Sequence, residues 1–477
     1  MKKFRVAENK MIHVDGHDFI FLVTDKAIFE MEPSTKEVLS HWLRKAEFTQ
    51  EEVLAHLTDP SEEREDFFEG LLKRHLIVPV NGKGPERKAA GSAHVSIPLK
   101  TLILHVTEAC NLGCLYCYYS EGGSSSGKTK RMSSEVARRA VDFLFDHSGN
   151  LEEVLLVFFG GEPLLNFKLI TSVVEYARKK ASERGKRVDF TMTTNGTLLT
   201  EEVVRFVQEN NISITISIDG FEGVHDRYRR FPDGSPSYGV ILPKVKNLIK
   251  AARRRRPVSA RVTLVEDAKV VPQILDHLLG LGFIEAGFAP VTTGNPDYQL
   301  GEKGMDLLLT QFKDLSRRFL QAVQKGEFFG FSNLIDLLVQ LHQGEVMNYP
   351  CGAGLALFSV AADGRLYLCQ RFTGEDAFCM GDIFEGFNQD KLEKFREQAE
   401  ISQKEACKQC WVRTVCTGGC YHEACVREGS HLKPNLHYCE WIKRWVEIGL
   451  EVYGRIAITS PDYLEKLSMS RGHAPVF

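Results

Sequence analysis

Residues 98–330 repeat one pattern, in which short apolar runs are each followed by an amphipathic stretch of helical period. Near-continuous apolar strands separated by such helices are typical of parallel β/α units, whose strands are buried on both faces. Expected strands cover residues 101–107, 154–161, 188–196, 212–220, 259–265 and 285–291, and expected helices include 133–147 and 169–183. Six such units predict an α/β fold, a partial (β/α)6 TIM-like barrel with its site at the carboxyl ends of the strands.

Residues 1–80 show a different pattern and predict a small separate module. Apolar or alternating stretches on either side of Gly16–His17 favour two strands joined by a hairpin turn. Three helical patterns follow, each beginning near a Ser, Thr or acidic cap: residues 34–43, 49–57 and 64–77. Residues 81–97 are rich in Gly, Ala and charge, and this composition predicts a linker.

Composition narrows the class of protein. The chain has 477 residues, is 43% hydrophobic and carries a net charge of −3, so bulk charge gives no reason to expect nucleic acid or anionic lipid as a partner. The run Arg253–Arg256 ends an expected helix and is interpreted as a solvated face. No apolar region follows the basic start and no run reaches the ~18–20 residues of a membrane span, so we expect no membrane association and a cytoplasmic location.

The chain has twelve cysteines. Because disulfides rarely persist in the cytoplasm, this number favours metal binding or catalysis over disulfide bonds. Cys110, Cys114 and Cys117 form a C-x3-C-x2-C array directly after the expected strand 101–107. Three thiolates can bind three irons of a [4Fe–4S] cluster and leave the fourth iron without a protein ligand. Zinc is the alternative, although structural zinc sites usually have four protein ligands and no fourth Cys or His follows nearby.

With Tyr116 before the last of these cysteines, the array resembles the signature of radical S-adenosylmethionine (radical SAM) enzymes. The resemblance implies that a reduced [4Fe–4S] cluster cleaves SAM to methionine and a 5′-deoxyadenosyl radical, which abstracts hydrogen from a substrate C–H bond. It also implies that Tyr116 lies near the adenine ring.

Further motifs follow the next three expected strands. Gly160, Gly161 and Glu162 belong to FFGGEP, Asn195 to TTNG and Ser217 to SIDG. Each motif alone is typical of a turn, but repetition at successive strand ends favours a ligand site. Glycines there let backbone carbonyls approach a ligand. The resemblance implies that FFGGEP holds the aminium group of SAM.

Arg229 lies shortly after SIDG, in the sequence HDRYR. A guanidinium group can form a bidentate contact with a carboxylate. The resemblance assigns the SAM carboxylate to Arg229, with Ser217 nearby; a surface salt bridge is the alternative interpretation.

Nine cysteines follow residue 350, and seven of them match a known family pattern. Cys351 is followed by Gly364 and Cys369, then by a C-x2-C-x5-C-x3-C array and a last cysteine eighteen residues later. This spacing resembles the SPASM domain of radical SAM maturases; a zinc ribbon remains the alternative. The resemblance implies two auxiliary [4Fe–4S] clusters, one bound by Cys407, Cys410, Cys416 and Cys439 and the other by Cys351, Cys369 and Cys420.

The second of these auxiliary sites lacks a ligand in the sequence. Fully ligated relatives have another cysteine shortly after the first, but GAGLALFSV follows Cys351 here. The cluster is therefore open, or Cys379 or Cys425 completes it. An open iron can bind a substrate thiolate, which suits carbon–sulfur bond formation; a closed cluster limited to electron transfer stays an equal alternative.

These patterns divide the chain into a module at 1–80, a linker, a radical SAM barrel at 98–330, a SPASM domain at 331–455 and a tail at 456–477. The chain resembles two SPASM subfamilies, the thioether-forming maturases of Cys-rich peptides and the quinohemoprotein amine dehydrogenase maturation protein. The resemblance implies a peptide maturase that forms Cys sulfur-to-carbon thioether crosslinks. Alternatives are formylglycine formation, for which no acidic base is identifiable, a carbon–carbon crosslink, oxidative decarboxylation and a non-catalytic metal-binding scaffold.

The N-terminal module resembles the winged-helix-like peptide-recognition domains of ribosomal peptide maturases. This resemblance implies that a ribosomally made peptide or small protein pairs with the edge of its sheet; a structural β/α cap is the alternative. An electron donor such as flavodoxin or ferredoxin is the other implied partner.

Overall fold

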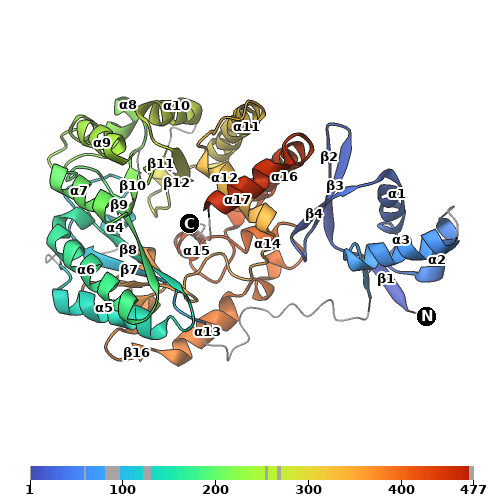
Figure 1. Ribbon diagram of the computed structural model, residues 1–477, viewed down its shortest axis with the longest axis horizontal. Helices are drawn as coiled ribbons and strands as arrows, with labels where there is room; N and C mark the ends of the chain where they lie inside the picture. The colour runs from blue at the N-terminus through green and yellow to red at the C-terminus, as the bar shows by residue number, and fades with distance from the viewer. Residues whose placement is uncertain are drawn as a thin grey trace.

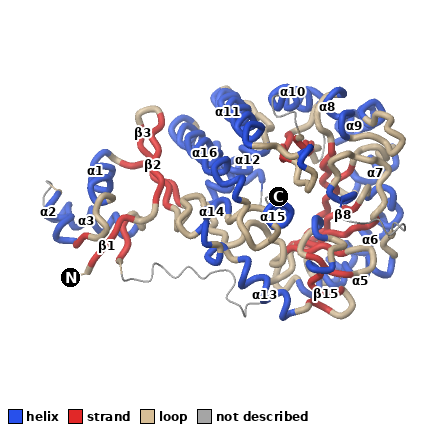
Figure 2. The backbone as a smooth tube through the Cα atoms, turned by 180° about the vertical axis from the view of Figure 1, so that it is seen from behind, coloured by secondary structure: helices blue, strands red, loops and turns tan. Residues whose placement is uncertain are grey.

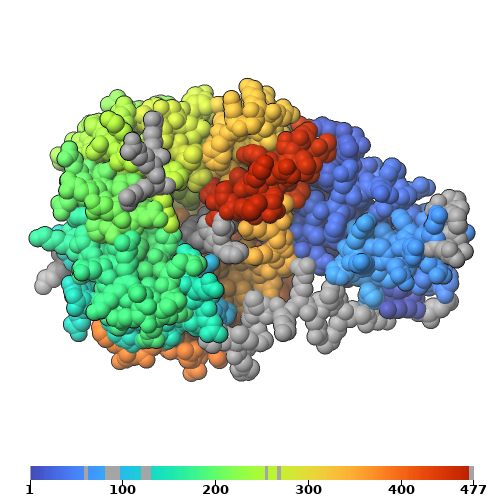
Figure 3. All heavy atoms as spheres, viewed as in Figure 1, coloured from blue at the N-terminus to red at the C-terminus, as the bar shows by residue number. Residues whose placement is uncertain are grey.

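The computed structural model describes residues 2–57, 61–80, 97–121, 130–252, 256–265 and 270–471. The N-terminal module lies at one end of the molecule, the barrel at the other, and the C-terminal helices and loops between them (Figures 1 and 3). The predicted linker, apart from residue 97, and the Gly/Ser-rich stretch 122–129 lie outside the described residues, as do Arg253–Arg255.

The six predicted barrel strands are confirmed. They are β7 (Thr101–Thr107), β8 (Glu153–Gly160), β9 (Arg187–Thr194), β10 (Ser213–Ser217), β11 (Ser259–Leu264) and β12 (Glu285–Pro290). All are parallel and are ordered β12-β11-β10-β9-β8-β7. β9 and β10 end earlier than predicted, because Gly196 and Gly220 adopt φ of +79° and +122° in the loops that follow.

Helices cover the outer face of this sheet (Figures 1 and 2). They are α5 (Ser134–His147), α6 (Phe167–Glu183), α7 (Glu201–Glu209), α8 (Glu222–Tyr228), α9 (Tyr238–Ala252) and α10 (Val271–Leu281). The predicted helices 133–147 and 169–183 are α5 and α6. Ser133 caps α5 by accepting a hydrogen bond from Val136 N, and Phe143 and Leu144 are fully buried. Burial of each such side chain contributes about 1.5–3 kcal/mol.

The sheet does not end with the barrel. β13 (Leu357–Val360) pairs in parallel with β7, and three antiparallel strands extend it to ten: β14 (Arg365–Tyr367), β15 (Cys379–Asp382) and β16 (Gly386–Phe387). β13 thus covers the edge that the first strand of an open barrel would expose. The cysteine-rich segment is therefore continuous with the barrel sheet rather than a detached domain after residue 330.

The N-terminal module contains the predicted hairpin and three helices, α1 (Pro33–Trp42), α2 (Gln50–His56) and α3 (Ser61–Lys73). The hairpin turns at Asp15–Gly16, where both φ values are positive. It belongs to a sheet of β2 (Asn9–Val14), β3 (His17–Leu22) and β4 (Ala27–Met31). A second sheet of β5 (Phe48–Thr49), β1 (Lys3–Val6) and β6 (Ile77–Pro79) was not predicted, because its short strands pair only across long stretches of chain. The winged-helix assignment stays a prediction.

The remaining helices are one short helix after the cysteine loop and those of the C-terminal part of the chain. They are α4 (Tyr118–Glu121), α11 (Glu302–Gln324), α12 (Ser332–Gln343), α13 (Gln389–Ala399), α14 (Arg413–Cys416), α15 (Tyr421–Glu428), α16 (Cys439–Thr459) and α17 (Pro461–Arg471). The boundary at residue 456 that the sequence suggested falls inside α16, and α17, which follows, buries Leu464 and Leu467. Lys10 of β2 forms an ion pair with Glu447 of α16 and so ties the N-terminal module to these helices. Within the described residues, every helix is too short or too polar to span a membrane.

Candidate functional site

The loop that carries Cys110, Cys114 and Cys117 follows β7 at the carboxyl end of the barrel. Cys110 is exposed at the surface of its loop, but the protein around its sulfur still raises the pKa of the thiol to about 11, and the neighbouring thiols of Cys114 and Cys117 add to this rise. Burial also raises the pKa of Cys114, while the Arg229 guanidinium opposes it. The structure thus brings the three predicted thiols together beside a cation.

Gly160 and Gly161 lie where β8 meets this loop. A Cβ atom on Gly160 would collide with the carbonyl oxygen of Thr107, and one on Gly161 with that of Ala109. Gly160 also has a φ of +132°, a conformation that favours glycine. The structural reason for both glycines is therefore close packing against the cysteine loop; their contact with the SAM aminium group stays a prediction.

Glu162 is fully buried at the end of β8. Its carboxylate accepts hydrogen bonds from Thr194 Oγ1 at 2.7 Å, Asn195 N at 2.8 Å and Leu164 N at 3.1 Å. Burial raises its pKa to about 7, although these hydrogen bonds oppose the rise. The side chain therefore holds the ends of β8 and β9 together, and its predicted contact with the aminium group remains untested.

Asn195 connects the end of β9 to the cysteine loop. Its amide donates to Asn111 Oδ1 at 3.0 Å and to Cys110 Sγ at 3.8 Å. Its Oδ1 accepts from the backbone N of Thr197 at 3.0 Å. Asn195 thus orients a predicted iron ligand, a position that suits the cofactor-binding role predicted for it.

Tyr116, Asp219 and Arg229 form a buried network above β10. Asp219 Oδ2 accepts from Tyr116 Oη at 2.5 Å and from Arg229 Nε at 2.8 Å. The guanidinium carbon lies 5.4 Å from the centroid of the Tyr116 ring. Burial alone would lower the pKa of Arg229, but the Asp219 charge more than offsets this effect and the pKa is raised. The network fixes Tyr116 and Arg229 beside Cys114.

This arrangement corrects one interpretation and adds a residue. Arg229 forms a buried ion pair with Asp219 rather than a surface salt bridge, and its contact with the SAM carboxylate stays a prediction. Asp219 was not among the predicted site residues. The signal was present, because SIDG places a carboxylate at a strand end ten residues before an arginine. Ser217, the last residue of β10, lies two residues before it and is partly buried.

The later cysteines fall into two groups of electrostatic neighbours, and their roles as cluster ligands stay predictions. Burial raises the pKa of Cys351 to about 11 and of Cys369 to about 12, and the thiol of Cys420 adds to both rises. Burial likewise raises the pKa of Cys416 to about 11, with contributions from three neighbouring thiols, those of Cys439, Cys407 and Cys410.

Cys379 and Cys425 have other surroundings. Cys379 Sγ donates to the carbonyl of Gly381 at 3.4 Å, and Tyr367 is its electrostatic neighbour. The pKa of Cys425 is raised by burial and by Glu375. The thiol neighbour of Cys351 is Cys420. The neighbours of these two cysteines include Gly381, Tyr367 and Glu375, and the identity of a fourth ligand for the group of Cys351, Cys369 and Cys420 stays a prediction.

Tyr118 lies between this second group and the first cysteine loop. Burial raises its pKa; Cys117 and Cys369 add to the rise, and Arg371 opposes it. The Arg371 guanidinium carbon lies 5.6 Å from the centroid of the Tyr118 ring. The predicted radical SAM site and the three-cysteine group therefore face one another across Tyr118 and Arg371.

Buried polar atoms without partners show whether the cysteine-rich segment fits an anionic cluster. Within the described chain, four such donors lie between residues 404 and 422: Lys404 Nζ, Thr417 Oγ1, Tyr421 Oη and His422 Nδ1. Cluster sulfur atoms accept hydrogen bonds, so this set of donors fits [4Fe–4S] groups held by the neighbouring thiolates. A site for a single metal ion, with three or more His, Cys, Asp or Glu ligands, is not found in the described residues.

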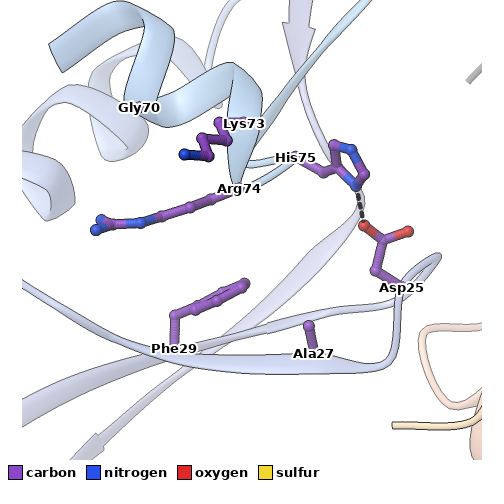
Figure 4. A pocket seen from close by; sticks show the side chains of 7 residues that line it. All are labelled: Asp25, Ala27, Phe29, Gly70, Lys73, Arg74 and His75. Carbon is purple, nitrogen blue, oxygen red and sulfur yellow. Dashed lines mark hydrogen bonds and ion pairs between the residues drawn. The ribbon is translucent and has the colours of Figure 1, made fainter. Parts of the chain in front are cut away.

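A groove in the N-terminal module has a cavity volume of about 470 Å³. It lies between β4 and the end of α3 and is lined by Asp25, Ala27, Phe29, Gly70, Lys73, Arg74 and His75 (Figure 4). His75 Nδ1 pairs with Asp25 at 2.5 Å and closes one end of the groove. Lys73 and Arg74 are exposed, so the rim is basic.

Comparisons with known proteins identify the barrel. Residues 104–267 match the family model of the Radical SAM superfamily. An uncharacterised protein of Methanocaldococcus jannaschii is 38% identical over 140 residues, 29% of this chain and 45% of that relative. The serine-type anaerobic sulfatase-maturating enzyme of Bacteroides thetaiotaomicron is 27% identical over 387 residues, 74% of this chain and 89% of the relative.

A solved structure shares the fold. Native anSMEcpe with bound AdoMet and Kp18Cys peptide superposes with a TM-score of 0.64 at 23% identity, covering 76% of this chain and 99% of that one. The matched residues 104–267 contain the cysteine loop and all or part of five of the six barrel strands, and this similarity supports a radical SAM oxidoreductase that modifies proteins or peptides with S-adenosylmethionine and [4Fe–4S] clusters.

Proposed function

We propose that this enzyme is a peptide maturase that forms thioether crosslinks between a Cys sulfur and a carbon of another residue in a ribosomally made peptide. Relatives named as sulfatase-maturating enzymes, which match about three quarters of the chain, support modification of a protein or peptide. A peptide is bound in the solved structure that shares the fold. When bound, SAM and the reduced cluster supply a radical that abstracts hydrogen from carbon.

The proposed thioether bond rests mainly on one structural observation. Cys351, Cys369 and Cys420 form a three-thiol group, while Cys379 and Cys425 lie in other surroundings. Three thiolates leave one iron of a [4Fe–4S] cluster without a protein ligand, and such an iron can hold a substrate thiolate. Tyr118 and Arg371 separate this group from the radical SAM cysteines, so both sites can serve one peptide in the same interior.

The residues of this chain have separate parts in the proposed reaction. Tyr116 and Arg229, held by Asp219, would orient SAM, and Asn195 would orient Cys110 as an iron ligand. The enclosing barrel excludes water, which would otherwise quench a reactive carbon radical. An electron donor such as flavodoxin or ferredoxin, in a cytoplasmic setting, would reduce the clusters.

The N-terminal module would recognise the substrate peptide. β4 is an edge strand of its sheet and borders the groove closed by His75 and Asp25. An extended peptide can add to such an edge through main-chain hydrogen bonds, while side chains such as Phe29 contact its alternate residues. This role rests on the arrangement of strand and groove together with the resemblance of the module.

The test is anaerobic co-expression of the enzyme with the small peptide encoded beside its gene, followed by mass spectrometry. Thioether formation predicts a loss of two hydrogen atoms per bridge and cysteines that resist alkylation. Fragmentation then identifies the acceptor carbon. Cysteines that stay alkylatable in a modified peptide would contradict the bond type while retaining the radical chemistry.

A second candidate is formylglycine formation, which the relatives named as serine-type and cysteine-type anaerobic sulfatase-maturating enzymes favour. Oxidation of a serine to formylglycine also removes two hydrogen atoms, so mass alone does not separate the candidates. An aldehyde-reactive hydrazide probe does, because it labels formylglycine and leaves a thioether unlabelled.

A further inference from the structure

Lys404 occupies an unusual position between the two later cysteine groups. It follows a short 3-10 helix, Ile401–Gln403, and its backbone carbonyl accepts from Cys407 N at 2.8 Å. The side chain is only 3% exposed. Four thiols lie within electrostatic range of the ammonium group, two from each group: Cys407 and Cys416 on one side, Cys351 and Cys420 on the other.

Among the described residues, no side chain forms an ion pair or hydrogen bond with this ammonium group. Nζ is buried and has no hydrogen-bond partner in the described chain. It lies 5.4 Å from the centroid of the Tyr421 ring, a weak cation–π distance. A Cβ atom on Gly418 would lie 2.7 Å from Nζ, so glycine at this position, with a φ of +87°, leaves room for the ammonium group.

A buried cation without a partner is costly, because it loses its hydration and gains no compensating charge. A lysine in such a position therefore indicates an anionic group that is bound between the cysteines. A [4Fe–4S] cluster ligated by thiolates is such a group, since its cysteines bind as anions. Because Lys404 lies near both cysteine groups, its single ammonium group can balance negative charge at both cluster sites.

We propose that Lys404 is a shared counter-charge for the two auxiliary [4Fe–4S] clusters and raises the reduction potential of both. The proposal rests on the cluster assignment made above. Reduction adds one negative charge to a cluster, and a nearby cation stabilises the reduced form more than the oxidised form. The radical SAM cluster serves as the internal reference, because the thiols that neighbour Lys404 belong to the two later cysteine groups.

The experiment compares the full-length wild-type enzyme with K404M, K404R and K408M after anaerobic cluster reconstitution. Midpoint potentials are measured by dithionite titration followed by electron paramagnetic resonance. Methionine keeps most of the side-chain volume and removes the charge. Lys408 is the matched control, because it lies four residues further on, is exposed and pairs with Glu405 at 2.5 Å.

In K404M we expect the midpoint potentials of both auxiliary clusters to fall by at least about 59 mV. For a one-electron couple, this shift corresponds to a tenfold change in the ratio of oxidised to reduced cluster. K404R and K408M should keep wild-type potentials. If K404M fails to assemble auxiliary clusters while K404R assembles them with wild-type potentials, the requirement for charge is also supported.

Three results would overturn the proposal: unchanged potentials in K404M at full iron content, an equal shift in K404R, or an equal shift in K408M. The iron content of the wild-type enzyme tests the underlying assignment separately. About twelve irons per chain are expected for three [4Fe–4S] clusters, and about four would reject the auxiliary clusters themselves.

Discussion

The radical SAM site and the cysteine-rich segment differ in how many of their buried polar groups find hydrogen-bond partners within the protein. At the barrel mouth, Asp219 satisfies Tyr116 and Arg229, and Glu162 accepts three hydrogen bonds. In the segment 404–422, four buried donors have no partner within the described chain. The side chains named at the barrel mouth are thus held by one another, whereas the segment 404–422 presents buried donors that a bound group would satisfy.

The largest expected effect concerns the first cysteine loop. Cys114→Ala should lower SAM cleavage by more than roughly 100-fold, because loss of an iron ligand costs more than the 10–100-fold typical of outer residues. The measurement is 5′-deoxyadenosine release after dithionite reduction. Cys425→Ala is the matched control and should retain cleavage, since the charged neighbour of Cys425 is Glu375 and this cysteine lies outside the predicted radical SAM array. Equal losses in both variants would contradict the division of the cysteines.

Removal of iron should affect the two regions unequally. We expect the segment 404–439 to lose hydrogen-exchange protection in metal-free protein, because each unsatisfied buried donor costs about 1–3 kcal/mol. Strands β8, β9 and β10 should keep their protection, since their hydrogen bonds are made within the protein. Hydrogen-exchange mass spectrometry of matched iron-loaded and iron-free samples gives the answer. Comparable loss in both regions would mean that the barrel mouth is not held by its own side chains.

Asp219→Asn should destabilise the protein by about 3 kcal/mol, because it leaves the buried Arg229 cation without its partner. It should also weaken SAM binding, since Tyr116 and Arg229 lose their common acceptor. Urea unfolding and calorimetric SAM titration measure the two effects. Asp276→Asn removes an exposed ion pair with Arg318 and should cost less than about 1 kcal/mol. Similar costs for the two variants would argue against a special role for the buried network.

The most gradual effect is a pH dependence at Glu162, which develops over a range of pH rather than at once. Burial raises its folded-state pKa from 4.5 to about 7, so the unfolded chain ionises first as pH rises. Folding stability should therefore fall between pH 4.5 and pH 7, by up to about 3 kcal/mol from this group. Glu162→Gln cannot ionise and should lose this component. The check is the difference in unfolding free energy between wild type and variant across that range; a constant difference would mean that Glu162 does not titrate there.

Local patterns in the sequence determined much of this protein. Apolar runs and helical periodicity located all six barrel strands, and cysteine spacing separated the ligand groups that the structure places together. These features were predictable because strand burial and loop motifs depend on residues close together in the chain.

Only the tertiary structure decided the contacts between distant residues. Tyr116 meets Asp219 across 103 positions, β13 pairs with β7, and α17 occupies what composition suggested was a tail. Lys404 carried no signal in the sequence, because a lysine among charged residues is usually exposed. Its burial between two cysteine groups follows from how the chain folds around them, and that packing makes it a candidate for tuning both clusters.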